Sequence, residues 1–307
     1  MSAPVVEALV TLGRRYVRGA PVPVGKALLA GRVLSPRLRE HPRRRVTGTR
    51  FGVRVAVDTR DLIQRYLYLF GVWEPHMTRW LRRRLRPGDT YVDVGANIGY
   101  HTLLAAHLVG EGGHVVAIEA SPALHRHLLR NVALNEFRNV RAVNRAVSDT
   151  DEILSFVLAS SANTGANSIV PYVGPAEAAF DIAARPLPAL LAEGEITRAR
   201  VIKIDVEGAE GSVVRGMRPM LPRLRPDAEI TVEVAPARMA RLGDSAGELM
   251  ETMRAHGFHA YRLVNAYTPE SYAAALRGTA RVPERLRGPV TGENDLVFSK
   301  IDADSLP

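Results

Sequence analysis

A short apolar strand that ends at a glycine turn and restarts as an apolar helix constrains the fold of this chain most. We expect the strand near 90–94, the turn at Gly95–Gly99 and the helix near 100–109. A turn with two glycines lets the backbone approach a ligand and leaves the first N–H groups of the helix free to bind it. Strands and helices then alternate toward the C-terminus, which predicts an α/β fold with a mostly parallel sheet and helices on both faces.

The remaining elements follow from hydrophobic periodicity and turn residues. Further strands are expected near 114–118, 140–146, 200–204, 229–233 and 294–299, and further helices near 122–134, 208–220 and 244–256. An insertion at about 150–186 interrupts the alternation, with strands at 152–158 and 181–184 and a polar loop at 160–168. Because such long insertions are often functional, we interpret this one as a lid or substrate gate.

Residues 1–88 precede this alternation and are strongly basic, with 19 Lys and Arg against 5 Asp and Glu. Part of that surplus reflects a general arginine bias, since 38 of the 41 basic residues are Arg. The pattern predicts helices at 5–17, 26–33, 61–69 and 75–85 and a hairpin at 45–57, with the second helix ended near Ser35-Pro36. We therefore divide the chain into a basic N-terminal arm and hairpin at 1–88, serving substrate or oligomer contacts, and a cofactor-binding domain at 89–307.

The charges around the glycine turn indicate which cofactor it binds. A dinucleotide turn needs a middle glycine for the pyrophosphate, but here Asn97 takes that place and Asp93 precedes the turn. A carboxylate there repels pyrophosphate and attracts an ammonium group. Glu119, at the end of the next strand, suits the two hydroxyls of a ribose. S-adenosylmethionine carries an ammonium, a sulfonium and a ribose but no phosphate, so the pattern favours it.

Four sequence strings resemble the FkbM family of S-adenosylmethionine-dependent methyltransferases. They are Val92-Asp93-Val94-Gly95-Ala96-Asn97-Ile98-Gly99-Tyr100-His101-Thr102, Ala117-Ile118-Glu119-Ala120-Ser121-Pro122, Asn144-Arg145-Ala146-Val147-Ser148-Asp149 and Ile202-Lys203-Ile204-Asp205-Val206-Glu207-Gly208-Ala209-Glu210. The resemblance covers about 60–235, plus 294–298 as the last strand. It implies a class I, Rossmann-like methyltransferase fold with a seven-stranded sheet. It also implies methylation of a hydroxyl oxygen, on a sugar or on a secondary metabolite of polyketide type.

We expect the cofactor to be bound at the carboxyl ends of the strands, where an open parallel sheet binds its ligands. Asn97 could bind the amino-acid end of the cofactor, and Asp149 either accepts from the adenine amino group or only forms a turn. Glu74 lies in a Trp-Glu-Pro string that resembles the aromatic-Glu-Pro motif of the family, and could close over the cofactor. The candidate cofactor-binding residues are Glu74, Asp93, Gly95, Asn97, Gly99, Glu119, Ser148 and Asp149.

The candidate catalytic residues are Asp205, Glu207 and Lys203. A hydroxyl acceptor needs a general base, for which Asp205 is our first choice and Glu207 our second. Lys203 shares the direction of Asp205 along the strand and could stabilise an alkoxide. Two alternatives stay open: Asp205 binds the methionine ammonium, or Glu207 caps the helix at Gly208.

A divalent metal is a less favoured possibility, in which Asp205, Glu207 and Glu233 would hold Mg²⁺. His101, in the first turn of the glycine-loop helix, is a further candidate base, although packing or capping explains it more simply.

Four functions stay in competition at this point. The first is an O-methyltransferase for a small hydroxylated natural product or sugar. The basic arm keeps an RNA methyltransferase open, although no aromatic-rich basic platform supports nucleic acid as a partner. The others are a non-catalytic cofactor-binding protein and an NAD(P) oxidoreductase.

Composition bounds the setting in which the protein works. The chain contains no cysteine, which excludes disulfides and thiolate metal sites. It shows neither a signal peptide nor a transmembrane stretch, so we expect a cytoplasmic protein. A weak contact of the basic arm with a membrane surface and a homo-oligomer both stay open.

Overall fold

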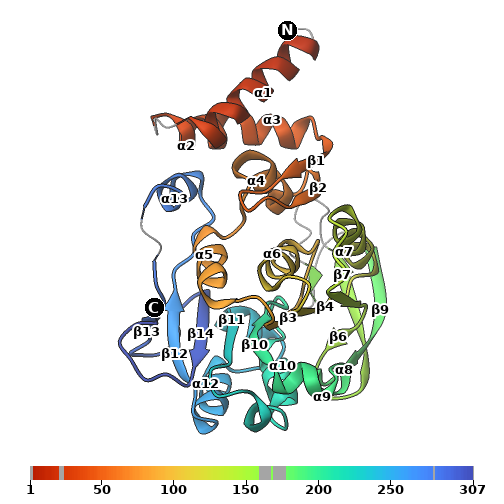
Figure 1. The fold of residues 1–307 in the computed structure, drawn as a ribbon, viewed down its shortest axis with the longest axis vertical. Helices are drawn as coiled ribbons and strands as arrows, with labels where there is room; N and C mark the ends of the chain where they lie inside the picture. Colours follow the sequence, from red (N-terminus) through yellow and green to blue (C-terminus); the bar gives the residue numbers. More distant parts are fainter. Residues whose placement is uncertain (1–2, 21–23, 159–166, 169–177, 279–280, 307) are drawn as a thin grey trace.

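The computed structural model describes residues 3–20, 24–158, 167–168, 178–278 and 281–306 of the chain. Its centre is a sheet with the strand order β13-β12-β14-β11-β10-β3-β4-β5 (Figure 1). The strands span β3 Thr90–Val94, β4 His114–Ile118, β5 Val140–Val143, β10 Ala199–Ile204, β11 Glu229–Val234, β12 His259–Leu263, β13 Glu284–Arg285 and β14 Asn294–Ser299.

Five neighbouring strands of this sheet, from β5 to β11, run parallel, and β14 pairs antiparallel with β11. The mostly parallel α/β fold predicted from the alternation is therefore confirmed. The predicted number of seven strands is wrong, because the described sheet has eight. It extends beyond β14 through β12 and the two-residue edge strand β13, neither of which the sequence pattern indicated.

Helices cover both faces of the sheet and close two apolar cores. The first core contains residues of α5 Pro75–Arg84 and α6 Tyr100–Val109, while α7 Pro122–Leu134 packs beside β4. The second core contains residues of α8 Leu187–Leu190, α9 Glu193–Thr197, α10 Glu210–Met217, η3 Leu221–Arg223, α11 Pro236–Arg241 and α12 Ala246–Ala255. Two fully buried sheet faces explain why the strands read as continuous apolar runs.

The N-terminal elements form a layer at one end of the molecule, with α1 at the top of Figure 1. They are α1 Ala3–Gly19, α2 Lys26–Leu28, the π-helix η1 Leu29–Leu34, α3 Ser35–Glu40, the hairpin β1 Arg44–Gly48 and β2 Arg54–Asp58, and α4 Leu62–Phe70. The predicted stop near Ser35-Pro36 is wrong, because the chain continues through π-helical turns into α3 with Pro36 in its first turn. Proline is tolerated there because the first helical N–H groups need no partner within the helix.

The predicted strand at 140–146 is two strands, because β5 ends at Val143 and a separate strand, β6 Ala146–Val147, follows. Between them the Asn144 amide donates to the carbonyls of Glu119 and Ala120, which bonds a side chain to the end of the neighbouring strand. The chain then leaves the central sheet, and β6 joins a second one.

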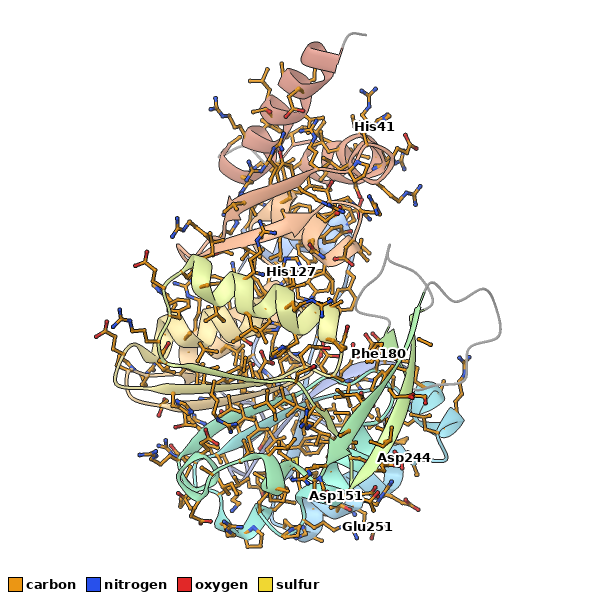
Figure 2. The ribbon with its side chains drawn as sticks, turned by 90° about the vertical axis from the view of Figure 1, so that its right-hand side faces the viewer. His41, His127, Asp151, Phe180, Asp244 and Glu251 are labelled. Atoms are coloured by element: carbon orange, nitrogen blue, oxygen red, sulfur yellow. The ribbon has the colours of Figure 1, made fainter. Side chains whose placement is uncertain are left out.

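The second sheet has the order β6-β9-β7-β8 and contains the insertion. Its other strands are β7 Glu152–Leu158, β8 Asn167–Ser168 and β9 Ala178–Arg185, which bear out the strands expected at 152–158 and 181–184. Most of the predicted polar loop at 160–168 lies outside the described residues. Figure 2 labels Phe180 on β9, and its ring stacks on that of Phe156 with centroids 5.4 Å apart.

One more helix, α13 Pro269–Ala275, packs between α2 and α5. None of the described helices combines the length and the apolar character that crossing a bilayer requires.

Candidate active site

A cavity of about 340 Å³ opens at the carboxyl ends of β3, β4, β10 and β11. Six carboxylates line it against two guanidinium groups, so its formal charge is negative. These side chains are Glu74, Glu119, Asp205, Glu207, Glu233, Glu293, Arg145 and Arg238. The apolar part of the wall includes Leu62, Ile63, Trp73, Ile118, Leu124, Val147, Leu154 and Phe156. Such a cavity suits a ligand with an apolar ring and positive charge.

The loop between β3 and α6 lies against the end of β10. Gly95 has a φ of 81°, and a Cβ there would lie 1.8 Å from the backbone oxygen of Asp205. Gly99 has a φ of 91°, and a Cβ there would lie 2.4 Å from Cδ1 of Leu128. Both positions require glycine. Asn97 is also left-handed, with a φ of 52°, which Asn adopts more readily than most residues.

Glu119, at the end of β4, is buried beside this loop. Its carboxylate accepts hydrogen bonds from the backbone N–H groups of Asn97, at 2.7 Å, and Ser121, at 2.8 Å. Burial raises the pKa of Glu119 to about 7, although both N–H groups act in the opposite direction. The structure thus brings together the carboxylate and the glycine turn that the sequence placed in one site, and their role in cofactor binding stays a prediction.

Asp93 lies within β3 and is almost fully buried, so it does not itself line the cavity. The Thr102 hydroxyl donates to Oδ2 of Asp93 at 2.6 Å, and the buried Tyr91 hydroxyl is a second hydrogen-bonding neighbour of this carboxyl group. Burial raises the pKa of Asp93, and the nearby Lys203 ammonium opposes that shift. Asp93 is thus a buried carboxyl group beneath the loop, where charge is costly unless a cation offsets it.

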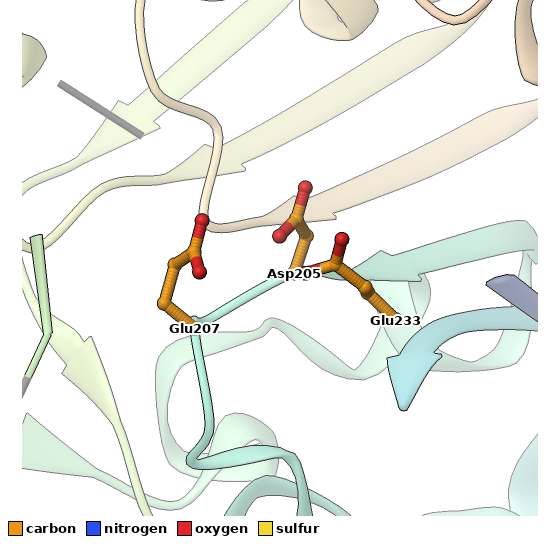
Figure 3. A group of neighbouring side chains, drawn as sticks. All are labelled: Asp205, Glu207 and Glu233. Atoms are coloured by element: carbon orange, nitrogen blue, oxygen red, sulfur yellow. The ribbon is translucent and has the colours of Figure 1, made fainter. Parts of the chain in front are cut away.

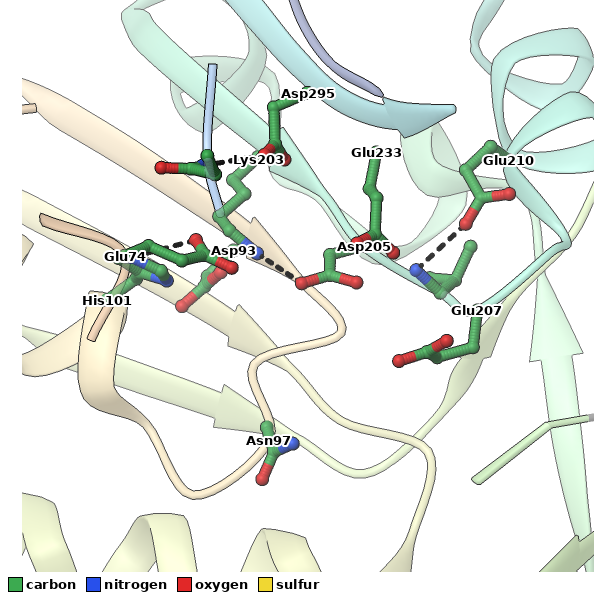
Figure 4. A network of polar contacts seen from close by, with 12 residues as sticks. Glu74, Asp93, Asn97, His101, Lys203, Asp205, Glu207, Glu210, Glu233 and Asp295 are labelled. Atoms are coloured by element: carbon green, nitrogen blue, oxygen red, sulfur yellow. Dashed lines mark hydrogen bonds and ion pairs between the residues drawn. The ribbon is translucent and has the colours of Figure 1, made fainter. Parts of the chain in front are cut away.

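Lys203 and Asp205 form a buried ion pair at the end of β10 (Figure 4). Nζ of Lys203 donates to Oδ2 of Asp205 at 2.8 Å. Burial lowers the pKa of Lys203, but Asp205, Glu74 and Asp93 outweigh it and hold that pKa above its usual range. Lys203 therefore stays charged and fixes Asp205, whose side chain is 29% exposed and faces the cavity. Lys203 does not line the cavity, so it lies behind the predicted base.

Glu207 and Glu233 converge on Asp205, and Figure 3 shows the three carboxylates pointing toward one another. One oxygen of each lies within 4.8 Å of the others, the spacing of a metal site. Arg238 binds both Glu207 and Glu233, with the second contact at 3.0 Å. Burial and Asp205 raise the pKa of Glu207 to about 8, against the effect of Arg238. Since Lys203 and Arg238 already balance the cluster, a metal there stays the less favoured possibility.

The turn after Asp205 differs from the helix start expected at 208, because α10 begins at Glu210. The Glu210 carboxylate accepts from the backbone N–H groups of Gly208, at 3.0 Å, and Val206, at 3.3 Å. Glu210 therefore takes the capping role at Gly208 that one of our alternatives gave to Glu207. This leaves the Glu207 side chain directed to the cavity and to Arg238.

Glu74 comes from outside the sheet, at the start of α5, and lines the cavity as its predicted closing role requires. The Tyr267 hydroxyl donates to Oε1 of Glu74 at 3.0 Å, and the Tyr267 ring stacks on Trp73 with centroids 5.2 Å apart. Burial, followed by the charge of Asp295, raises the pKa of Glu74 to about 8. Glu74 is therefore mainly protonated at neutral pH.

His101 lies deep beside Glu74, with its Nε2 3.6 Å from Oε2 of that side chain. Burial and the Lys203 charge lower the pKa of His101 well below its usual value. The pair is therefore neutral, and His101 does not line the cavity. The packing interpretation of His101 fits this position better than a role as base.

Four of the predicted cofactor residues do not line the cavity: Asp93 and Gly99 lie behind it, in β3 and the glycine loop, whereas Ser148 and Asp149 are engaged in other contacts. The Ser148 hydroxyl donates to Glu152 at 2.5 Å, and Arg215 donates to Oδ2 of Asp149 at 2.8 Å. Despite the opposing effect of burial, the Arg215 contact holds the pKa of Asp149 below its usual value. The geometry thus favours the alternative of a structural turn over a contact with adenine. The cause is the end of β5 at Val143, which diverts the chain into the second sheet.

The sequence pattern missed several residues that shape the cavity. No motif marks three of them. Arg238 lies in α11 after β11, Tyr267 follows β12, and Glu293 directly precedes β14. Arg145 lies inside a quoted family string, yet only the structure shows that it reaches the cavity. One sequence signal could have identified Arg238: it is a basic residue that shortly follows Glu233, a carboxylate at the end of a strand.

These residues fit S-adenosylmethionine. The carboxyl-rich lining suits its ammonium and sulfonium, and Glu119 lies beside the glycine loop at the end of β4, as the predicted ribose contact requires. The strand order with one antiparallel strand beside β11, together with this rim, defines a class I S-adenosylmethionine-dependent methyltransferase.

The comparison with known families identifies the chain more closely. The Methyltransferase FkbM domain profile matches residues 93–260, more than half of the sequence. The chain belongs to the FkbM methyltransferase family, as the resemblance predicted.

Individual relatives cover different shares of the chain. The hexuronic acid methyltransferase AglP of Haloferax volcanii is 27% identical over 191 residues, which are 62% of this chain and 72% of that protein. The protein-L-isoaspartate O-methyltransferase of Methanothrix thermoacetophila is 37% identical over 71 residues, 22% of this chain and 34% of that one. In this match and three other short ones, the chain spans only 14% to 34% of the relatives' own length.

A solved S-adenosylmethionine-dependent O-methyltransferase of Thermotoga maritima aligns with a TM-score of 0.42 and 12% identity, covering 84% of this chain and 78% of that one.

Proposed function

We propose that the protein transfers a methyl group to a hydroxyl oxygen of a small sugar or natural product, with Asp205 as the general base. The observation that carries this proposal is the Lys203–Asp205 pair. In this pair the accessible Asp205 carboxylate faces the cavity, and the Lys203 ammonium that balances it is buried behind it.

When bound, S-adenosylmethionine supplies the methyl group as a positively charged electrophile. The residues that would hold it are Gly95, Asn97 and Glu119 at the glycine loop, with the buried Asp93 beneath the loop and Glu74 closing from α5. Asp205 would accept the proton of the acceptor hydroxyl, and Lys203 would keep Asp205 oriented. Glu207 stays the second candidate base, but its contact with Arg238 and its raised pKa make it the poorer one at neutral pH.

The charge of the cavity supports a small acceptor over the rival functions. The carboxyl-rich lining offers few cations to phosphate groups, since Arg238 already binds Glu207 and Glu233; this argues against RNA and against the pyrophosphate of NAD(P). Arg145 is the lining cation that binds no carboxylate among the described residues; its guanidinium donates to the carbonyl of Asn144, at 2.8 Å. The hexuronic acid named for the AglP relative makes sugars the first class to test.

The test is a methyl-transfer assay with labelled S-adenosylmethionine and a panel of neutral sugars, uronic acids and hydroxylated aromatic compounds. We expect a product that gains one methyl group as a methyl ether. Asp205→Asn should lower kcat by roughly 100-fold or more while cofactor affinity changes little, because the amide cannot take the proton.

The matched control is Glu251→Gln, an exposed carboxylate on α12 that should leave kcat unchanged. Full turnover by Asp205→Asn on the true acceptor would refute the assignment of the base. A methylated nitrogen or carbon in the product would refute O-methylation.

A further inference from the structure

A second pocket, of about 200 Å³, lies between the N-terminal helices and α13. Its charged lining residues are all basic, namely Arg18, Lys26, Arg50 and Arg277, and no Asp or Glu of the described part of the chain lines it. The phosphate-free cofactor and a neutral acceptor leave this pocket without a role.

The cations of this pocket are oriented by uncharged groups. Arg18 donates to the Thr47 hydroxyl at 3.0 Å, and Arg50 donates to the carbonyl of Phe70 at 2.9 Å. Arg50 also donates to the carbonyl of Arg18 at 2.9 Å, which binds two elements of the pocket to each other. These contacts fix the guanidinium groups of Arg18 and Arg50 without pairing them with a carboxylate.

Burial and mutual repulsion both disfavour the charged forms of these side chains. Burial, then the charges of Arg14 and Arg50, lower the pKa of Arg18 to about 10. Burial also lowers the pKa of Lys26, followed by the charges of Arg50 and Arg277. A bound anion would relieve both effects.

The fold makes room for this cluster at the end of α4. Gly71 has a φ of 73°, and a Cβ there would lie 2.1 Å from Nη2 of Arg18. Any side chain at this position would displace the guanidinium. The same pocket reaches α13, in which the Tyr272 hydroxyl accepts from the backbone N–H of Glu74 at 3.1 Å.

We propose that the pocket formed by Arg18, Lys26, Arg50 and Arg277 is a binding site for a phosphate or diphosphate group. Guanidinium groups bind phosphate oxygens through paired N–H donors, and several cations around one small volume suit a group of two or more negative charges. The phosphate can belong to a soluble molecule or to a lipid headgroup. The lipid source is worth testing because Val24 and Leu28, on either side of Lys26, are 73% and 53% exposed.

The experiment uses the full chain and two probes, inorganic pyrophosphate measured by calorimetry and vesicles of phosphatidylglycerol measured by co-sedimentation. Phosphatidylcholine vesicles are the lipid control. The double variant Lys26→Ala/Arg277→Ala should weaken binding of the recognised probe by roughly 100-fold, since each charge-assisted contact contributes about tenfold. Arg241→Ala removes an exposed arginine on α11 and should change the affinity less than about twofold.

Cofactor affinity is measured for every variant, because it shows that the sheet and its rim remain folded. Loss of pyrophosphate binding in the double variant assigns a soluble phosphate ligand, and loss of phosphatidylglycerol binding alone assigns a lipid headgroup. Wild-type protein that binds neither probe overturns the proposal, as does a double variant that binds as tightly as the wild type.

Discussion

The two pockets of this protein carry opposite charge. The cavity at the sheet edge has six carboxylates against two guanidinium groups, whereas the N-terminal pocket has four cations and no carboxylate. The structure therefore separates charge that the sequence shows only as a basic first part and a mildly acidic remainder. The difference indicates two ligands of opposite sign, a cationic cofactor at the sheet and an anionic group at the N-terminal layer.

The two pockets also differ in how their charges are balanced. In the cavity, Lys203 and Arg238 pair with the carboxylates around them, so only part of the negative charge is unmatched. In the N-terminal pocket the cations bind carbonyl and hydroxyl groups instead. In the first site the charges thus orient one another, as the proposed catalysis requires, whereas in the second uncharged groups orient the cations and leave their charge available to an anion.

The largest expected effect is the loss of cofactor binding when a carboxyl group at the acidic cavity is removed. Glu119→Ala should weaken S-adenosylmethionine binding by at least roughly 100-fold, because the acceptor for two ribose hydroxyls is lost. Asp93→Ala should do the same, because it removes the buried carboxyl group beneath the glycine loop. Calorimetry measures both affinities, with Glu251→Ala as the exposed control, and near-normal binding by both variants would contradict the proposed cofactor site.

The second effect concerns the loop that holds the acidic cavity in shape. Gly95→Ala should lower the free energy of unfolding by about 2–4 kcal/mol, because the added Cβ meets the Asp205 carbonyl and the left-handed backbone is strained. Gly257→Ala is the matched control, since Gly257 also has a φ of 81° but has open space around it. It should cost only about 1 kcal/mol.

Urea unfolding measures both glycine variants. Equal losses would show that backbone strain alone, without contact to Asp205, explains the requirement for glycine at the turn.

The smallest expected effect is a pH dependence of the ligand-free protein. Burial raises the pKa of Glu74 from 4.5 to about 8, so between these values the folded chain keeps a proton that the unfolded chain releases. Stability should therefore be highest near pH 5 and fall as pH rises toward 8. Glu74→Gln, which cannot ionise, should flatten this fall, so its melting temperature should exceed that of the wild type by a few degrees at pH 8.5.

Thermal scans from pH 5 to pH 9 test this expectation. Glu251→Gln, on the exposed face of α12, should follow the wild-type curve, and a Glu74→Gln curve parallel to the wild type would disprove the raised pKa.

The positions of Glu119 and Asp205 could be predicted because each directly follows a recognisable strand, and strand ends of a parallel sheet share one edge. Asp149 was misplaced by the same rule. The strand before it ends early, at Val143, and the side chain of Asn144 bonds to the neighbouring strand in place of the backbone. Periodicity cannot reveal such a break, because the residues on both sides of it are apolar.

By itself the sequence determined the alternating sheet, the glycine turn and the strand-end carboxylates, because backbone periodicity and the needs of a left-handed turn are local. Only the tertiary structure decided which charges meet. Arg238 binds Glu207 and Glu233, and Tyr267 binds Glu74. Arg277 and Arg18 line the same pocket. Each of these contacts joins chain segments that no sequence motif connects. Side-chain charge acts over a few ångströms in space, whatever the separation along the chain, so the chemistry of both pockets follows from packing.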